Sequence, residues 1–186
     1  MAAAILTVGF MGLIQAVTIT SGMMDNARRQ TLAAQILQHE IESLRYASWA
    51  TISTLPTTPV AIGADWNGGT SYSLGDLVSF SGGWYRCIFA NSGQTPPSTA
   101  YWKSDPPPYA NVLATTGVAY GATYTLTRTV ANVVSDGSLR EATFSLTWVV
   151  ATSRRDGSGN PVSFTYTRIN SAYFGKYGLN LTYQRS

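Results

Sequence analysis

The sequence offers few groups suited to catalysis, and the best placed of them are His39, Glu40 and Glu42. The single histidine of the chain lies in a stretch with helical spacing, next to acidic residues. A zinc-binding helix is expected to carry two histidines four residues apart, and no serine elbow is present that His39 would activate as a base. We therefore expect His39 to be solvated or to lie at an interface.

Three aspartates form the other candidate group, because two carboxylates held close together act as general acid and base. They are Asp65, Asp76 and Asp105. Asp76 follows Gly75, and an aspartate in such a turn usually bonds to its own backbone, so we expect it to brace that turn. No glycine-rich phosphate loop precedes a helix. The sequence thus indicates a protein that is not an enzyme, with no cofactor and no metal site.

The composition favours a β-rich protein outside the cytoplasm. Only 11% of the 186 residues are charged, the net charge is +3, and Thr, Ser, Gly and Tyr are abundant. No basic run is longer than Arg28-Arg29 or Arg154-Arg155, and nucleic-acid binding would require a basic stripe. We therefore expect no nucleic-acid partner. The lone Cys87 excludes an intrachain disulfide and is expected to be a small buried residue.

A long helix is predicted over residues 1–49. Residues 1–24 contain no charge and no proline, and at ~1.5 Å per residue they would span ~36 Å, enough for a bilayer core of ~30 Å. Charged residues and helical periodicity begin together after residue 24, and a single apolar face is expected. That face consists of Ala34, Leu37, Ile41 and Leu44. The glycines here, with Thr18, Thr20 and Ser21, lower helix propensity and predict a bend or a locally unwound turn between Gly12 and Gly22, and a continuous straight helix is the alternative.

Residues 2–16, AAAILTVGFMGLIQA, and residues 35–49, QILQHEIESLRYASW, resemble the N-terminal helix of type IV pilins and the related pseudopilins. The resemblance implies an inner-membrane protein that becomes a subunit of an extracellular cell-surface filament of identical subunits. It also implies that a basic leader, a cleavage site and a glutamate precede Met1. The residues expected to form the filament core are Ala4, Ile5, Val8, Gly9, Phe10, Gly12, Leu13, Ala16 and Val17.

Residues 50–64 are rich in Thr and Pro and are predicted to be a linker. Residues 65–105 are crowded with aromatics, and short strands at Asp76–Phe80 and Trp84–Phe89 predict a hairpin. The segment resembles small chitin- and cellulose-binding carbohydrate modules. The matching positions are Trp66, Tyr72, Gly75, Asp76, Val78, Tyr85, Pro96, Pro97 and Trp102. The resemblance implies glycan binding through Trp84, Phe89 and Tyr101, and a purely structural decoration is the alternative.

Residues 110–186 are predicted to form a pilin-like head. Strands are expected at Tyr124–Val134, at 140–151 and at Val162–Ile169, joined as an antiparallel meander. One face of the second strand should lie on the amphipathic half of the helix. That face consists of Ala142, Phe144, Leu146, Trp148 and Val150. The expected fold is α+β, with a long N-terminal helix on an antiparallel meander and a small all-β inserted module.

Three functions remain open from the sequence. The first is a structural subunit of a type IV pilus-like filament that polymerises through its hydrophobic helix. The second is a minor pilin or adhesin that binds a polysaccharide through the inserted module. The third is a pseudopilin of a type II secretion system, in which a short filament acts as a piston.

Overall fold

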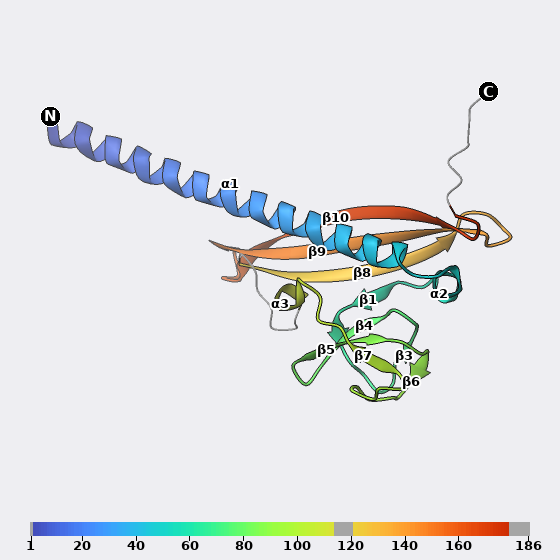
Figure 1. The fold of residues 1–186 in the computed structure, drawn as a ribbon. Helices are drawn as coiled ribbons and strands as arrows, with labels where there is room; N and C mark the ends of the chain where they lie inside the picture. The colour runs from blue at the N-terminus through green and yellow to red at the C-terminus, as the bar shows by residue number, and fades with distance from the viewer. Residues whose placement is uncertain (1, 114–120, 179–186) are drawn as a thin grey trace, which may run out of the picture.

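The computed structural model describes residues 2–113 and 121–178, and it has an α+β architecture. One long N-terminal helix lies across a sheet, and a smaller group of strands hangs from the side of that sheet (Figure 1). We call the sheet with its helix the head and residues 64–105 the module. The N-terminal part of the helix projects well beyond the head.

The helix α1 runs without interruption over Ala2–Arg45. The expected bend or unwound turn between Gly12 and Gly22 is therefore wrong, because a glycine costs only about 1 kcal/mol in a helix of this length. The hydroxyls of two threonines in this region bond within the helix: Thr18 Oγ1 donates to the Ile14 carbonyl and Thr20 Oγ1 to the Ala16 carbonyl, both at 2.8 Å. Figure 1 draws α1 as one continuous helix without a kink.

The helix ends earlier than residue 49. After Arg45 the chain turns, and a short helix α2 occupies Trp49–Thr54. Ser48 caps α2, because its hydroxyl oxygen accepts a hydrogen bond from the Thr51 amide at 3.3 Å. Serine at this position satisfies an amide that a helix start leaves unpaired. The capped turn therefore separates two helices where the sequence pattern predicted one.

The described part of the head sheet has the strand order β1-β8-β9-β10. Its strands are β1 Val60–Ile62, β8 Ala122–Asn132, β9 Leu139–Arg155 and β10 Pro161–Gly175. All neighbours pair antiparallel, so the expected meander of three long strands is confirmed. Alternate residues of β8 are buried, as a sheet covered on one face requires.

The core of the head lies between α1 and β9. Four side chains of β9 are at most 1% exposed, namely Ala142, Phe144, Leu146 and Trp148. They pack in one cluster with the buried face of α1, which consists of Ala33, Ile36, Leu37, Ile41 and Leu44. The expected face included Ala34, which is only half-buried, and Ala33 takes its place in the core. Val150 packs at the edge of the same cluster.

The module contains two small sheets, with orders β2-β4-β5-β7 and β3-β6. The strands are β2 Ala64–Asp65, β3 Ser71–Tyr72, β4 Leu77–Phe80, β5 Gly83–Cys87, β6 Asn91–Ser92 and β7 Trp102–Ser104. The predicted hairpin is confirmed as β4 and β5. Its two-residue turn has positive φ at Ser81 (49°) and Gly82 (77°), the geometry that matches the twist of paired strands. Tyr72, Val78, Cys87 and Trp102 form the module's own small core.

The segment 50–64 differs from the predicted linker. It contains α2, and its strand β1 pairs with β8 of the head. Directly after β1, Gly63 donates its amide to the Leu77 carbonyl, and β2 then pairs with β4 in the module. The chain therefore passes from the head sheet to the module without a free connection.

Candidate functional site: an uncovered apolar helix and a fixed module

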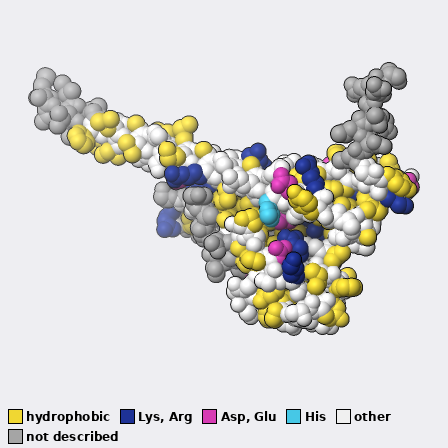
Figure 2. All heavy atoms as spheres, viewed as in Figure 1, with side chains coloured by type: hydrophobic (Ala, Val, Ile, Leu, Met, Phe, Trp, Pro, Cys, Tyr) yellow, Lys and Arg dark blue, Asp and Glu magenta, His cyan; other side chains and the backbone are white. Residues whose placement is uncertain are grey.

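The projecting part of α1 is an apolar surface with no cover from the described chain. Large side chains on it are between 55% and 71% exposed. They are Phe10, Met11, Leu13, Ile14, Val17, Ile19, Met23 and Met24. Figure 2 shows this apolar surface along the arm, with charged side chains appearing where the arm meets the head. An exposed apolar surface of this kind marks an interaction site.

The apolar side chains surround the helix. At about 100° per residue, Phe10, Val17 and Met24 fall on one side, while Ile19 and Met23 fall on the opposite side. A helix that packs against one partner carries a single apolar stripe, whereas one that is apolar all round is buried on all sides. The arm therefore suits a bundle in which several helices enclose it.

Two polar side chains of the arm do not oppose such burial. Thr18 and Thr20 already donate their hydroxyl protons to the carbonyls of their own helix. Gly12 and Gly22 have open space around them, since a Cβ atom at either position would meet nothing within 4 Å. Small residues of this kind let helices approach closely. No contact within the described chain accounts for these two glycines.

The predicted assembly residues all lie on this arm. Phe10, Leu13 and Val17 are exposed, and Gly12 and Ala16 lie between them on the same helix. Ala4, Ile5, Val8 and Gly9 belong to the helical backbone, but their side chains lie outside the described residues. Of the residues that the sequence analysis selected, Phe10, Gly12, Leu13, Ala16 and Val17 lie on the described part of the arm.

The expected membrane crossing is not supported. Among the described residues, no helix combines the length and apolarity needed to span a membrane. Polar residues interrupt the apolar run, namely Gln15, Thr18, Thr20 and Ser21.

A buried ion pair joins the module to the head. Arg128 Nη2 of β8 lies 2.7 Å from Asp76 Oδ1 of the module, and their side chains are 2% and 5% exposed. The other oxygen, Asp76 Oδ2, accepts the Ser73 amide at 2.8 Å, which confirms that Asp76 braces its own turn. Leu77 and Trp84 of the module also pack in the core of the head. The module is therefore fixed by a shared core and a buried charge pair.

The role of Arg128 was not found from the sequence, although a signal was present. In the strand pattern, Arg128 occupies the same face as Tyr124, Leu126 and Val130, which are buried. An arginine is rarely buried without a partner. Its position in a buried register therefore indicates a carboxylate on a neighbouring element, and Asp76 is that carboxylate.

A second polar contact connects α1 to the segment that follows the module. The Tyr109 hydroxyl donates to Glu40 Oε1, and both side chains are buried. Burial and the adjacent Glu40 carboxylate raise the pKa of Tyr109. His39 lies edge-on to the Tyr109 ring, with ring centroids 5.4 Å apart. His39 is half-buried at this junction between α1 and the segment after the module.

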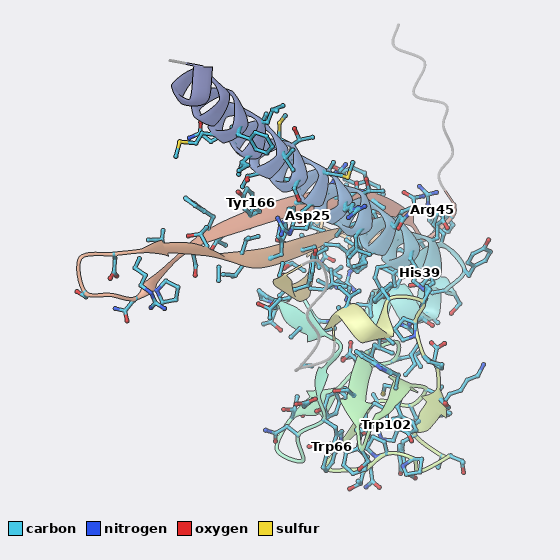
Figure 3. The ribbon with its side chains drawn as sticks, turned by 90° about the vertical axis from the view of Figure 1, so that its left-hand side faces the viewer. Asp25, His39, Arg45, Trp66, Trp102 and Tyr166 are labelled. Carbon is cyan, nitrogen blue, oxygen red and sulfur yellow. The ribbon has the colours of Figure 1, made fainter. Side chains whose placement is uncertain are left out.

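A cleft of about 500 Å³ lies between the end of α1 and the module. His39 and Glu42 line one side, and Arg86 and Asp105 line the other. Figure 3 shows His39 on the part of α1 that lies next to the module. Arg86 is committed to structure, because its Nε donates to Asp105 and its Nη1 to the Gly75 carbonyl at 3.0 Å. In the described chain, no group of three or more His, Cys, Asp or Glu residues is placed to hold a metal ion.

The three residues expected to bind a glycan differ in their exposure. Trp84 is 9% exposed and packs in the core of the head, so it cannot stack on a sugar, and the expectation for Trp84 is wrong. Tyr101 is half-buried against the module core. Phe89 is 68% exposed. The sequence did not reveal the burial of Trp84, because the core that it joins is built from segments far from it in the chain, both before and after it.

Cys87 is expected to resist alkylation in the folded protein. It is 1% exposed, and burial, together with the nearby Asp76 carboxylate, raises the pKa of its thiol from 9.0 to about 11. The folded state therefore disfavours the thiolate, so as the pH rises from 9 through 11 the free energy of unfolding should fall by up to about 3 kcal/mol. Iodoacetamide labelling at pH 8 should be at least about 100-fold slower in buffer than in denaturing urea. Equal labelling rates in the two solutions would contradict this placement.

Comparisons with known proteins give no relative from which to transfer a function. No family model matches the chain, and no curated protein or solved structure matches it either.

Proposed function

We propose that this chain is the structural subunit of a type IV pilus-like extracellular filament. The observation that carries the proposal is the arm of α1, whose large apolar side chains are exposed on every side. Fully burying one such side chain contributes about 1.5–3 kcal/mol. Copies of the arm that bundle together would bury all of these side chains at once. No surface within the described chain covers them.

The rest of the fold suits display on the outside of such a bundle. The C-terminal half of α1 is held in the core of the head, so the arm and the head form one rigid unit. The module lies on the β1 side of the sheet, away from the projecting arm (Figure 1). When subunits associate through identical but non-closing contacts, they form a helical polymer. In that polymer the arms would form the centre and the modules the surface.

The test is electron microscopy of filaments sheared from cells that express the full chain, with the subunit identified in the purified material. We expect helical filaments whose central density is a bundle of α-helices. A full-length chain that stays a monodisperse monomer without detergent would overturn the proposal. Filaments in which the arm lies on the outside would overturn it as well.

A second candidate function is glycan capture by the outer surface of the module, and the exposed ring of Phe89 favours it. Aromatic rings exposed on a rigid strand framework are suited to packing on apolar faces of sugars. In this arrangement Phe89, and not Trp84, would provide the stacking surface.

The two aromatic residues should respond differently to substitution. Trp84→Ala is expected to lower the free energy of unfolding by about 3–5 kcal/mol, because it opens a cavity in the core of the head. Phe89→Ala should change it by less than about 0.5 kcal/mol and should abolish any retention on insoluble chitin or cellulose. Urea unfolding and pull-down of the full chain measure the two effects. Equal retention of the wild type and Phe89→Ala would exclude this surface.

A further inference from the structure

The strand β10 forms an open edge of the head sheet. It is 15 residues long, and within the described residues it pairs only with β9. The opposite edge strand, β1, has three residues and leads into the module. An open edge presents a row of unpaired amides and carbonyls that can add a strand from another chain.

Apart from the charge of Arg168, the usual protection of an edge strand is limited to the first residues of β10. Natural edges are blocked by short strands, prolines, bulges and charges, especially lysine. Pro161 and the single irregularity in register lie before Ser163. From Ser163 to Gly175 the strand has no proline and no lysine, and Arg168 is its only charged residue. Large side chains along it are exposed, including Phe164 at 52%, Ile169 at 62% and Tyr173 at 47%.

We infer that this edge pairs antiparallel with β10 of a second copy of the chain, about a two-fold axis at Ile169. The inference is independent of the proposed function, because it does not use the arm. A two-fold axis at Ile169 overlaps the whole regular strand Ser163–Gly175 with itself, which is the largest number of backbone hydrogen bonds available. Any other centre shortens the paired region.

The side chains are compatible with this register. The most exposed apolar residue of the strand, Ile169, faces its own copy, and Thr167 faces Ser171. The charged Arg168 faces the amide of Asn170. A centre one residue earlier would place Arg168 opposite Arg168, and like charges directly opposite each other destabilise a strand pair.

The module does not obstruct this edge of the sheet. The module hangs from the β1 side of the sheet, so it lies away from the β10 edge (Figure 1). A two-fold axis normal to the sheet keeps the face that binds α1 on the same side in both copies, with the two helices antiparallel. The contact closes on itself. It therefore joins two subunits, or two neighbouring filaments, and does not extend a polymer by itself.

The test is disulfide cross-linking of the full chain in detergent, where contacts between the arms are masked. Directly opposed residues in an antiparallel pair have Cα atoms about 4.5–5.5 Å apart, within the range of a disulfide. Ile169→Cys should form a covalent dimer on mild oxidation. Thr167→Cys alone should not, because two copies of residue 167 lie about 13 Å apart along the strands in this register. An equimolar mixture of Thr167→Cys and Ser171→Cys should form the heterodimer.

The wild-type chain is the matched control, because its one cysteine, Cys87, is buried. As a second variant, Ile169→Lys places two like charges opposite each other and should weaken dimerisation at least about 10-fold in sedimentation experiments. Its urea unfolding should be unchanged, because the side chain is exposed in the monomer. Absence of the Ile169→Cys dimer, or equal cross-linking of Thr167→Cys alone, would overturn the inference. Loss of filaments without loss of this dimer would affect the proposed function only.

Discussion

Val17→Asp is expected to abolish assembly of the full chain into filaments. In the isolated subunit Val17 is 68% exposed on the projecting arm. In a bundle of arms the new carboxylate would be buried without a partner, which costs several kcal/mol per subunit. That cost should raise the concentration required for assembly by about 100-fold or more. Negative-stain electron microscopy and sedimentation after removal of detergent measure the effect.

The stability of the head should not be changed by Val17→Asp. Val17 lies outside its core, so the urea unfolding of the head should match that of the wild type within about 0.5 kcal/mol. Val133→Asp is the matched control, because it places the same charge at an exposed valine of the head, 46% accessible. That variant should assemble normally. If Val17→Asp formed filaments as readily as Val133→Asp, the arm would not be the assembly surface.

Arg128→Ala is expected to lower the free energy of unfolding by about 3–5 kcal/mol, a large fraction of the stability of a protein of this size. The substitution leaves the Asp76 carboxylate buried between head and module without its cation. It also removes the charge pair that joins two parts of the chain 52 residues apart. Urea unfolding followed by tryptophan fluorescence measures the loss, since Trp84 and Trp148 lie in the shared core.

A double substitution distinguishes the effect of the unpaired charge on stability from the effect of lost side-chain packing. With Arg128→Met and Asp76→Leu together, no charge is left unpaired, and most of the lost stability should return. Arg128 Nε has no hydrogen-bond partner among the described residues, so the pair is incompletely compensated even in the wild type. Asp76→Leu also removes the brace on the Ser73 amide, which should retain a deficit of about 1 kcal/mol. A double variant as unstable as Arg128→Ala would mean that the loss arises from packing and not from the unpaired charge.

The spacing of apolar side chains along the sequence was sufficient to predict much of the fold. The helical spacing of Leu37, Ile41 and Leu44 and the alternation of Phe144, Leu146 and Trp148 each identified a buried face. The structure places these two faces against each other. Periodicity succeeds here because each element buries one face, and a face is defined by residues that are near each other in sequence.

Local pattern failed where a residue's environment came from a distant segment. From its neighbours in the sequence, Trp84 is predicted to be an exposed ring of a small module. In the structure it is buried in the core of the head. The composition of segment 50–64 predicts a linker. In the structure its strand β1 completes the head sheet by pairing with β8, which follows more than 60 residues later. In both cases the missing information was a contact between separate parts of the chain.

The amino-acid sequence by itself determined that an uncharged apolar stretch opens the chain, that an amphipathic helix continues it and that β-strands follow. Each of these depends on the order of neighbouring side chains. Only the tertiary structure decided that the apolar arm stands free of the head, that Asp76 and Arg128 meet in a buried pair, and that β10 is left as an open edge. The openness of the β10 edge is a statement about residues 2–113 and 121–178, in which only β9 pairs with it. All three features depend on which surfaces of distant elements cover one another, and burial of that kind is settled only when the whole chain has packed.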